Sequence, residues 1–129
     1  MPFVQISLME GKSPEHISAI SESVHQALVE VFKIPEPDKF QVIHEVKSHQ
    51  LIFPDNFLGI SHTDNLVYVH ITAKEGRTVD IKRDLYARIV ALVRERTDLS
   101  ADDVIIVLAD AKAENWSFGQ GIAQLVDMT

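Results

Sequence analysis

The sequence contains no cysteine among its 129 residues. This absence excludes disulfides, thiolate nucleophiles, zinc–thiolate sites and iron–sulfur clusters, and it is compatible with a reducing compartment. No apolar run approaches the roughly 18 residues of a membrane span. The N-terminal segment has no basic region before an apolar stretch, which a secretory signal would require. We therefore expect a cytoplasmic protein that does not cross or bind a membrane.

Positive charge is also scarce, with 12 Lys and Arg residues against 19 acids and a net charge of −7. A chain of this charge is a poor candidate for a nucleic-acid partner. The sequence lacks GxxxxGK(S/T), GxGxxG, GxSxG and HExxH, so nucleotide-dependent and Ser-triad chemistry have no support. The histidines show no metal-ligand spacing, and we predict neither a metal nor a cofactor.

The first half of the chain has the pattern of a strand, a helix and a second strand. Residues 3–9 place apolar side chains at every second position, as in a half-buried strand. Ser13 and Pro14 suit the start of a helix, and apolar residues at spacings of three and four continue it to about residue 33. The remaining segments of this half are an extended run at 39–46, a candidate short strand at 50–53, and a loop at 54–64.

The second half repeats this order. A β-rich run at 65–73 precedes a turn at 76–78, a helical pattern at 79–97 and an apolar strand at 103–109. The last strand is apolar almost throughout, which predicts burial on both of its faces. Val4 and Val67 are 63 positions apart, and the two helix starts, Ser13 and Thr78, are 65 apart.

Two strand–helix–strand units, 1–63 and 64–129, are therefore expected to form one α+β domain over 1–129. The crossover makes each strand pair parallel and right-handed. We expect a four-stranded mixed sheet with pseudo-two-fold symmetry and two helices on one face. No third layer remains in the sequence to cover the other face, which predicts self-association through the sheets. The alternative is a monomeric two-layer sandwich with a polar outer face.

Proline at position 2 is the first candidate for chemistry. Initiator methionine is usually removed before so small a residue, which would leave Pro2 as a free secondary amine. An α-amino group titrates near about 7.7–8.0, and desolvation or nearby cations lower that pKa, as suits a base that removes a proton beside a carbonyl. The alternative is that the dipeptide is only a common start. While Met1 is attached, Pro2 is an amide and cannot act as a base.

Arg77 is the second candidate, in a turn between the third strand and the second helix. Anions bind at the carboxyl ends of strands and at helix N-termini, and a guanidinium can hold a carboxylate with two hydrogen bonds. Lys74 is close by in the sequence. The alternative is that Arg77 is a solvated turn residue.

Four more residues are open between a functional and a structural role. Asp38 follows Pro37 at the start of a strand, and it is either a turn acid or a neighbour of Pro2. His25 lies on the first helix, where a lone histidine is more often structural or exposed. Trp116 and Phe118 follow the last strand and could wall a pocket or fill a contact between subunits.

In combination these features resemble the tautomerase superfamily. The resemblance rests on Pro2 before a strand, two β-α-β units, Gly76-Arg77-Thr78 followed by Lys82, and the WSFGQG segment at 116–121. It covers essentially the whole chain, and the nearest branch is similar to malonate semialdehyde decarboxylase. It implies a homotrimer in which an N-terminal proline acts on a small carboxylate substrate in a pocket between subunits.

The resemblance also implies roles for individual residues. Arg77 matches the family arginine that holds the substrate carboxylate. Asp38 matches the acid that pairs with proline in the decarboxylase, and Trp116 and Phe118 match the aromatic wall of that enzyme. His25 matches a helix histidine of the related cis-3-chloroacrylic acid dehalogenase. Two positions depart from the pattern. Lys74 or Glu75 stands in place of a second arginine, and Ser117 stands in place of the water-activating glutamate of the dehalogenase, which disfavours dehalogenation.

Three hypotheses follow for function. In the first, neutral Pro2 catalyses keto–enol tautomerisation of a 2-oxo acid such as phenylpyruvate, with Arg77 and Lys74 on the carboxylate. In the second, protonated Pro2 polarises a 3-oxo acid such as malonate semialdehyde, or forms an imine with it, for decarboxylation. Asp38 would then stabilise the prolinium cation. In the third, the chain is a non-catalytic protein that binds a small acid.

Overall fold

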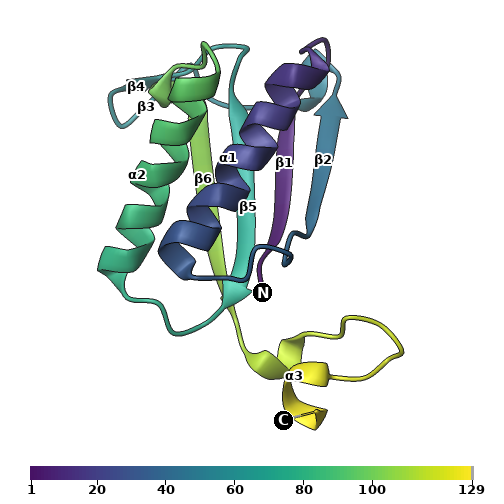
Figure 1. The fold of residues 1–129 in the computed structure, drawn as a ribbon. Coiled ribbons are helices and arrows are strands. Elements are labelled where there is room, and N and C mark those ends of the chain that lie inside the picture. Colours follow the sequence, from purple (N-terminus) through teal and green to yellow (C-terminus); the bar gives the residue numbers. More distant parts are fainter. Residues whose placement is uncertain (129) are drawn as a thin grey trace.

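Four strands and two long helices dominate residues 1–128, which are the residues that the computed structural model describes (Figure 1). The first unit comprises β1 (Phe3–Met9), α1 (Pro14–Phe32) and β2 (Gln41–Val46), and the second comprises β5 (Val67–Lys74), α2 (Val79–Arg96) and β6 (Val104–Ala111). The shorter elements are η1 (Ser48–Gln50), β3 (Asn56–Phe57), β4 (Ile60–Ser61), η2 (Ala101–Asp103), η3 (Ala113–Asn115) and α3 (Gln124–Asp127).

Both long helices begin at the hydroxyl residues that the sequence predicts as caps. The Ser13 hydroxyl accepts a hydrogen bond from the His16 amide at 3.0 Å, and the Thr78 hydroxyl accepts one from the Ile81 amide at 3.2 Å. α1 ends because Lys33 adopts a left-handed conformation with φ of 60°, and Pro35 cannot continue a helix.

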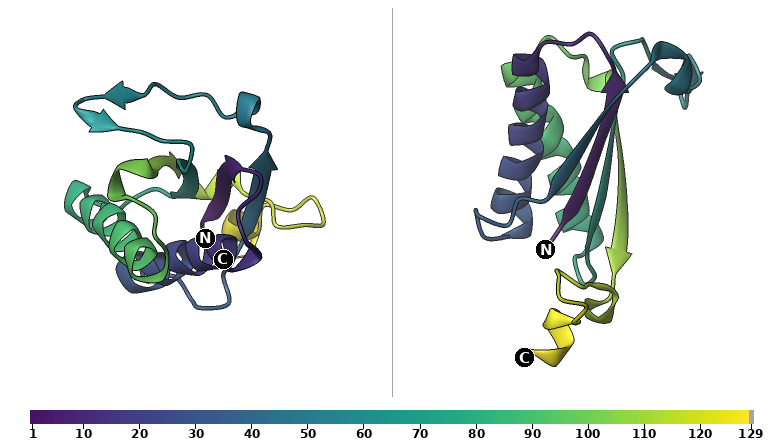
Figure 2. Two further views of the ribbon diagram at one scale, coloured as in Figure 1. Left: turned by 90° about the horizontal axis from the view of Figure 1, so that it is seen from above. Right: turned by 90° about the vertical axis from the view of Figure 1, so that its right-hand side faces the viewer.

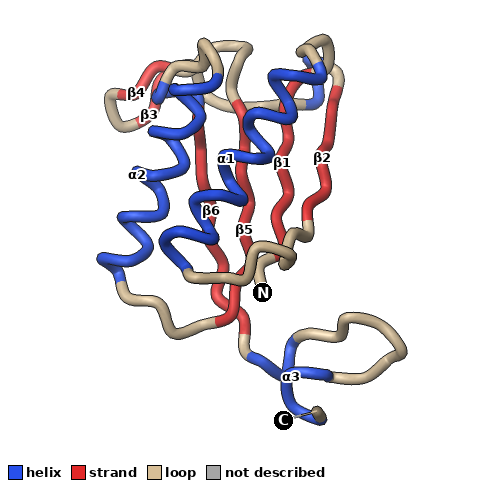
Figure 3. The backbone as a smooth tube through the Cα atoms, in the orientation of Figure 1, coloured by secondary structure: helices blue, strands red, loops and turns tan. Residues whose placement is uncertain are grey.

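The four main strands form one mixed sheet in the order β2-β1-β5-β6 (Figure 3). β1 is parallel to β2 and β5 is parallel to β6, while the two central strands, β1 and β5, are antiparallel. α1 and α2 lie side by side on one face of the sheet (Figures 1 and 2). The predicted α+β class, the repeated unit and the placement of both helices on one face are confirmed.

The hydrophobic core lies between the sheet and the two helices, and both units contribute to it. Alternate residues of the central strands face the helices and are at most 2% exposed: Val4, Ile6 and Leu8 from β1, and Val67, Val69, Ile71 and Ala73 from β5. The helices pack against these strands with Ile20, Val24 and Leu28 from α1, and with Leu85, Ile89 and Leu92 from α2. The period of two in the strands and of three and four in the helices thus produces one shared core.

The opposite face of the sheet has no layer over most of its width within residues 1–128 (Figure 2). It presents the alternate set of side chains, which mixes polar groups such as Gln5 and His70 with apolar groups such as Val107. The prediction that the last strand is buried on both faces is therefore wrong for the single chain. β6 is an edge strand, and Val107 is 51% exposed.

The connection between the two units also differs from its prediction. Residues 51–53 form no strand, and Ile52 is 81% exposed. A turn precedes them, in which the Lys47 amide donates a hydrogen bond to the Gln50 side chain at 3.0 Å. The predicted loop at 54–64 instead contains the small hairpin β3–β4. Leu58 and Gly59 form its tip with positive φ values of 53° and 77°, which suits a two-residue hairpin turn.

Asp103 lies in the turn before β6 rather than in the strand, and it ties the hairpin segment to the sheet. It is 2% exposed, and its carboxylate accepts hydrogen bonds from the Thr63 amide at 2.7 Å and the Thr63 hydroxyl at 2.6 Å. We expect Asp103→Ala to lower the free energy of unfolding by about 2–3 kcal/mol, because two hydrogen bonds from Thr63 to a buried, charged acceptor are lost. Urea denaturation of the variant measures the loss.

Asp102→Ala is the matched control, because Asp102 is the exposed neighbour in the same turn. It should change the free energy of unfolding by no more than about 0.5 kcal/mol. Equal losses in the two variants would show that the turn itself, and not the bonds to Thr63, requires acidic residues.

Candidate functional site

Strand pairing brings four separate segments to one edge of the sheet, the lower edge in Figure 1. Phe3 pairs with Thr72, so the start of β1 lies beside the end of β5. The Val4 amide donates to the Phe40 carbonyl at 3.0 Å, which brings in the segment before β2. The Glu75 amide donates to the Ala111 carbonyl at 2.9 Å, which places the exit of β6 at the same edge. Pro2, Asp38, Lys74, Arg77 and the C-terminal segment therefore converge.

Pro2 is buried at this edge, against a cavity of about 160 Å³ with aromatic walls. The lining residues are Pro2, Phe3, Phe40, Trp116, Ser117 and Phe118. The Trp116 and Phe118 rings are stacked, with centroids 5.6 Å apart and planes 10° apart, and the Phe118 centroid lies 6.0 Å from that of Phe40. The structure thus places three predicted site residues, Pro2, Trp116 and Phe118, around one small apolar space.

The loop that carries the aromatic pair is closed by a single side chain. The Gln124 amide group accepts from the Phe118 backbone N–H at 2.9 Å and donates to the Gly119 carbonyl at 2.7 Å. Gly119 has φ of 128°, a conformation that side chains disfavour, so the tight turn after Phe118 requires glycine. These two hydrogen bonds close the turn that directly follows the aromatic pair.

Three charged side chains act on the N-terminal amine, which Met1 carries in the structure. Burial, Arg77 and Lys74 lower the pKa of this amine below its ordinary value, whereas Asp38 raises it. The net direction is downward, so a larger share of the amine is neutral at a given pH than in an exposed chain terminus. The structure therefore groups Asp38, Lys74 and Arg77 electrostatically around the start of the chain.

Arg77 is half-buried and held rigidly before any ligand is present. Its Nη1 donates to the Lys74 carbonyl at 2.8 Å and its Nη2 to the Phe32 carbonyl at 3.3 Å, and the guanidinium carbon lies 4.5 Å above the centre of the Phe32 ring. Burial lowers the pKa of Arg77, and Asp110 opposes that shift. A guanidinium has five N–H donors, so Arg77 retains donors with which to bind a carboxylate.

His25 does not line the aromatic cavity. Its side chain is buried, at 3% exposure, and its Nε2 lies 2.7 Å from the backbone carbonyl of Glu36. Glu114 is exposed and also outside the cavity lining, whereas Ser117 is part of it.

Sequence reasoning did not identify three aromatic residues of this region: Phe3, Phe40 and Phe32. Phe3 and Phe40 line the cavity only because two parallel strands start side by side, and the ring of Phe32 supports the guanidinium of Arg77. The one usable signal was positional. Phe40 directly precedes the strand that the β-α-β rule pairs with β1, and that strand starts beside Pro2.

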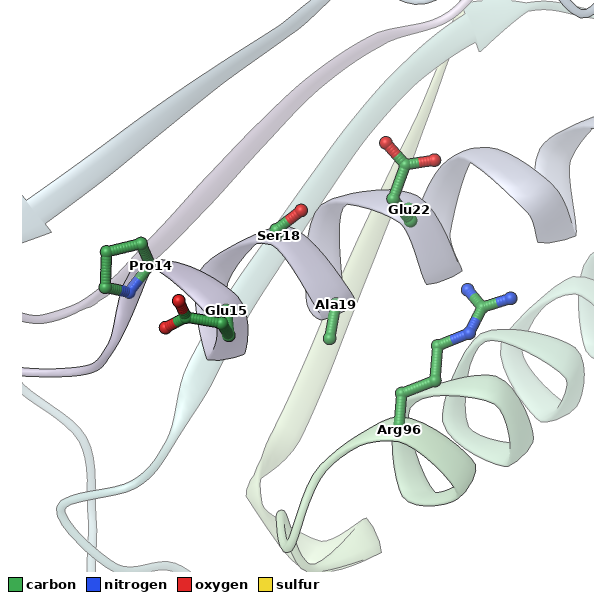
Figure 4. Close-up of a pocket in the computed structure, with 6 residues that line it drawn as sticks. All are labelled: Pro14, Glu15, Ser18, Ala19, Glu22 and Arg96. Atoms are coloured by element: carbon green, nitrogen blue, oxygen red, sulfur yellow. The ribbon is translucent and has the colours of Figure 1, made fainter.

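A larger hollow of about 680 Å³ lies on the helix side, between the start of α1 and the end of α2 (Figure 4). It is lined by Pro14, Glu15, Ser18, Ala19, Glu22 and Arg96. The guanidinium of Arg96 donates to Ser23, at 3.2 Å, and to Gln26, so it is already engaged within the helix pair. No predicted site residue lines this hollow.

Among residues 1–128, no group of three or more His, Cys, Asp or Glu side chains could hold a metal ion. None of the helices in this part of the chain is long and apolar enough to span a membrane.

Two β-α-β units place a buried Pro2, an aromatic wall and two cations at one edge of the sheet, and the comparisons show which family shares this arrangement of strands and helices. The chain belongs to the tautomerase family: a family model described as a tautomerase enzyme matches residues 38–119, and a second model with the same description matches residues 2–59. The resemblance inferred from the sequence is thereby confirmed.

Individual relatives cover nearly the whole chain. The probable tautomerase YusQ of Bacillus subtilis (strain 168) is 37% identical over 127 residues, which are 98% of this chain and 100% of that protein. The crystal structure of FG41 malonate semialdehyde decarboxylase inhibited by 3-bromopropiolate has a TM-score of 0.89 at 33% identity and covers 96% of this chain and 94% of its own. A fused 4-OT solved as a symmetric trimer shares the fold, with a TM-score of 0.77 at 20% identity and coverage of 97% and 98%.

The opposite charges of Arg77 and Asp38 predict in which direction each substitution shifts the pKa of the N-terminal amine. In the chain that retains Met1, Arg77→Gln should raise the pKa of the amine, because a neighbouring cation is lost, and Asp38→Asn should lower it, because an anion is lost. Titration of the amine by NMR measures both shifts.

Arg83→Gln serves as the control, because Arg83 is an exposed residue of α2 that pairs with Asp80 at 3.6 Å. It should leave the pKa of the amine unchanged. Shifts of the same sign in the Arg77 and Asp38 variants would contradict the arrangement described above.

Proposed function

We propose that this chain, once Met1 is removed, is an enzyme in which the Pro2 nitrogen transfers protons on a small oxo acid. The favoured reaction is keto–enol tautomerisation of a 2-oxo acid such as phenylpyruvate. The observation that carries the proposal is the convergence of a buried Pro2, an aromatic cavity and the two cations, Lys74 and Arg77, whose effect on the terminal amine is to lower its pKa.

The proposed reaction needs one base that becomes an acid. Neutral Pro2 accepts a proton from the carbon beside the carbonyl, and the electrons of the C–H bond form the C=C bond of an enolate. The resulting prolinium then donates that proton to the enolate oxygen, which gives the enol and restores neutral Pro2. The reverse sequence converts enol to keto acid, and no other reactant is consumed.

The other residues would bind the substrate and orient it. Arg77, already fixed by its two carbonyl contacts, is suited to hold the carboxylate, and exposed Lys74 adds a second positive charge. Trp116 and Phe118 would face the apolar end of the acid. The cavity of about 160 Å³ is on the order of the space that admits one benzene ring.

Decarboxylation of a 3-oxo acid such as malonate semialdehyde is the alternative, and two observations favour it. Asp38 stabilises the protonated amine. Decarboxylation needs this cation, because the cation polarises the carbonyl of the substrate. The solved structure at 33% identity is also a malonate semialdehyde decarboxylase by its own description. A non-catalytic small-acid binding protein remains the third hypothesis, and retention of Met1 in the native chain would support it.

We also propose that the chain assembles as a homotrimer through the uncovered face of the sheet. One neighbour of the same fold is a trimer. One feature of this chain supports the proposal: Val107 is 51% exposed in the middle of a strand, on the face that the helices do not cover. A neighbouring subunit would cover it.

Activity should depend on Pro2 and Arg77 in different ways. With Met1 removal verified by mass spectrometry, Pro2→Ala should abolish turnover, because the base is lost, and Arg77→Ala should chiefly raise KM, because the carboxylate loses its anchor. Assays with phenylenolpyruvate and malonate semialdehyde measure both effects. Arg83→Ala, on the exposed face of α2, is the control and should match the native enzyme.

The protonation state of Pro2 separates the hypotheses. An NMR titration of its nitrogen should give a pKa near or below neutrality if tautomerisation is the main activity. A pKa well above 8 would rule out tautomerisation as the main activity and would agree with the decarboxylation hypothesis. Unchanged turnover in Pro2→Ala would refute the enzymatic proposal, and retention of Met1 in the native chain would support the binding protein.

Assembly should fail when a charge is placed on the uncovered face. Val107→Arg is expected to yield monomers, because three buried guanidinium groups would lack partners in the assembled sheet faces. Light scattering after size exclusion distinguishes a mass near three times 14.5 kDa from a single chain. Val79→Arg, at an exposed position of α2, should leave the trimer intact, and a trimeric Val107→Arg variant would overturn the proposed interface.

A further inference from the structure

The segment that carries Asp38 has few internal hydrogen bonds to hold it. It connects α1 to β2, and Pro35 and Pro37 contribute no backbone N–H. Its two internal backbone bonds close turns, from the Asp38 amide to the Pro35 carbonyl at 3.0 Å and from the Lys39 amide to the Pro37 carbonyl at 2.8 Å. The position of the Asp38 carboxylate therefore depends on what holds this segment from outside.

Three side chains from other elements hold it, at its start, middle and end. Arg77 donates to the carbonyl of Phe32 at 3.3 Å, His25 Nε2 lies 2.7 Å from the carbonyl of Glu36, and the Lys39 ammonium pairs with Glu22 on α1. The Lys39–Glu22 pair is exposed to solvent and contributes little. The His25 contact is short, and the histidine that makes it is itself buried, so we take it as the main constraint on the segment near Asp38.

The direction of the hydrogen bond between His25 and Glu36 follows from the atoms that make it. A carbonyl oxygen only accepts, so Nε2 must carry the proton and donate it. The carboxylate of Glu36 lies 3.8 Å from the same nitrogen and is exposed, so the backbone carbonyl is the main partner. Glu36 and Pro37 are the central residues of the turn that ends at Asp38. His25 therefore holds the middle of the turn whose last residue is the acid.

We propose that His25 is a positioning residue that places the Asp38 carboxylate relative to the N-terminal amine by donating a hydrogen bond to the Glu36 carbonyl. This role rests on the proposed function only in that Asp38 would act on Pro2. Its geometric part, the hold on the turn, is independent of any substrate. It assigns His25 an action through Asp38, in place of direct contact with substrate.

The test compares two variants of His25 that differ in the donor they offer. His25→Gln can present an amide N–H close to the place of Nε2, whereas His25→Asn keeps a polar amide that is too short to reach it. The readout is the pKa of the N-terminal amine, measured by NMR titration in the chain with Met1 and in the trimmed chain. Turnover is recorded in parallel.

We expect His25→Asn to lower the pKa of the amine by at least half as much as Asp38→Asn does, because a displaced carboxylate stabilises the cation less. In the trimmed enzyme kcat/KM should fall by roughly 10–100-fold, as misplacement of a catalytic group does. His25→Gln should restore most of both values. The double variant His25→Asn/Asp38→Asn should resemble Asp38→Asn alone, because the two changes act through one carboxylate.

His16→Asn is the matched control, a histidine at the other end of the same helix, and it should leave the pKa of the amine unchanged. The proposal is overturned if His25→Asn lowers thermal stability but leaves that pKa as in the native chain, since His25 would then be only structural. Additive shifts in the double variant would overturn it as well. If Pro2→Ala retains activity, the proposed function fails, but the titration of the Met1 amine still decides the role of His25.

Discussion

The antiparallel pairing of β1 with β5 is the constraint on which the site depends. Each strand–helix–strand unit can form its own parallel pair, but neither contains a complete site. Pro2 and Arg77 are 75 positions apart in the sequence, and they meet only because Phe3 is paired with Thr72, so that the first strand starts where the third one ends. The parallel partners then follow without further information, since Phe40 must lie beside the start of β1 and Ala111 beside the end of β5.

Arg77 connects the two units a second time. Its guanidinium, carried by the second unit, donates to the last residue of α1 in the first unit and lies on the ring of that same residue, Phe32. These contacts hold the side chain before a ligand arrives, which reduces the entropy lost on binding a carboxylate. They also link the anion-binding group to the start of the segment that carries Asp38. The candidate anchor and the candidate acid are therefore parts of one connected structure.

The sequence predicted elements well where a local pattern decides them and poorly where distant pairing does. Caps at Ser13 and Thr78 and the repeat of about 63 residues were enough for the helices, the four strands and the mixed sheet. The same patterns could not show that β6 is an edge strand, because an apolar strand has the same composition whether a helix, a neighbouring strand or another subunit covers it.

The sequence patterns also could not show that His25 points at Glu36, since that contact depends on how two prolines shape the segment after α1. For Pro2, Trp116 and Phe118, which line one cavity, sequence order and resemblance together were sufficient.

The choice between the two proposed reactions reduces to a balance of charges at one nitrogen. At the Met1 amine, burial and two cations favour the neutral form, and a single carboxylate favours the cation; we expect the same groups to act on the Pro2 nitrogen once Met1 is removed. The fold itself buries the amine and holds the guanidinium of Arg77 in place, whereas Asp38 lies on a turn with few internal hydrogen bonds. The attraction between opposite charges weakens as their separation grows, so a shift of this turn would change how strongly Asp38 favours the cation, without any change in the core.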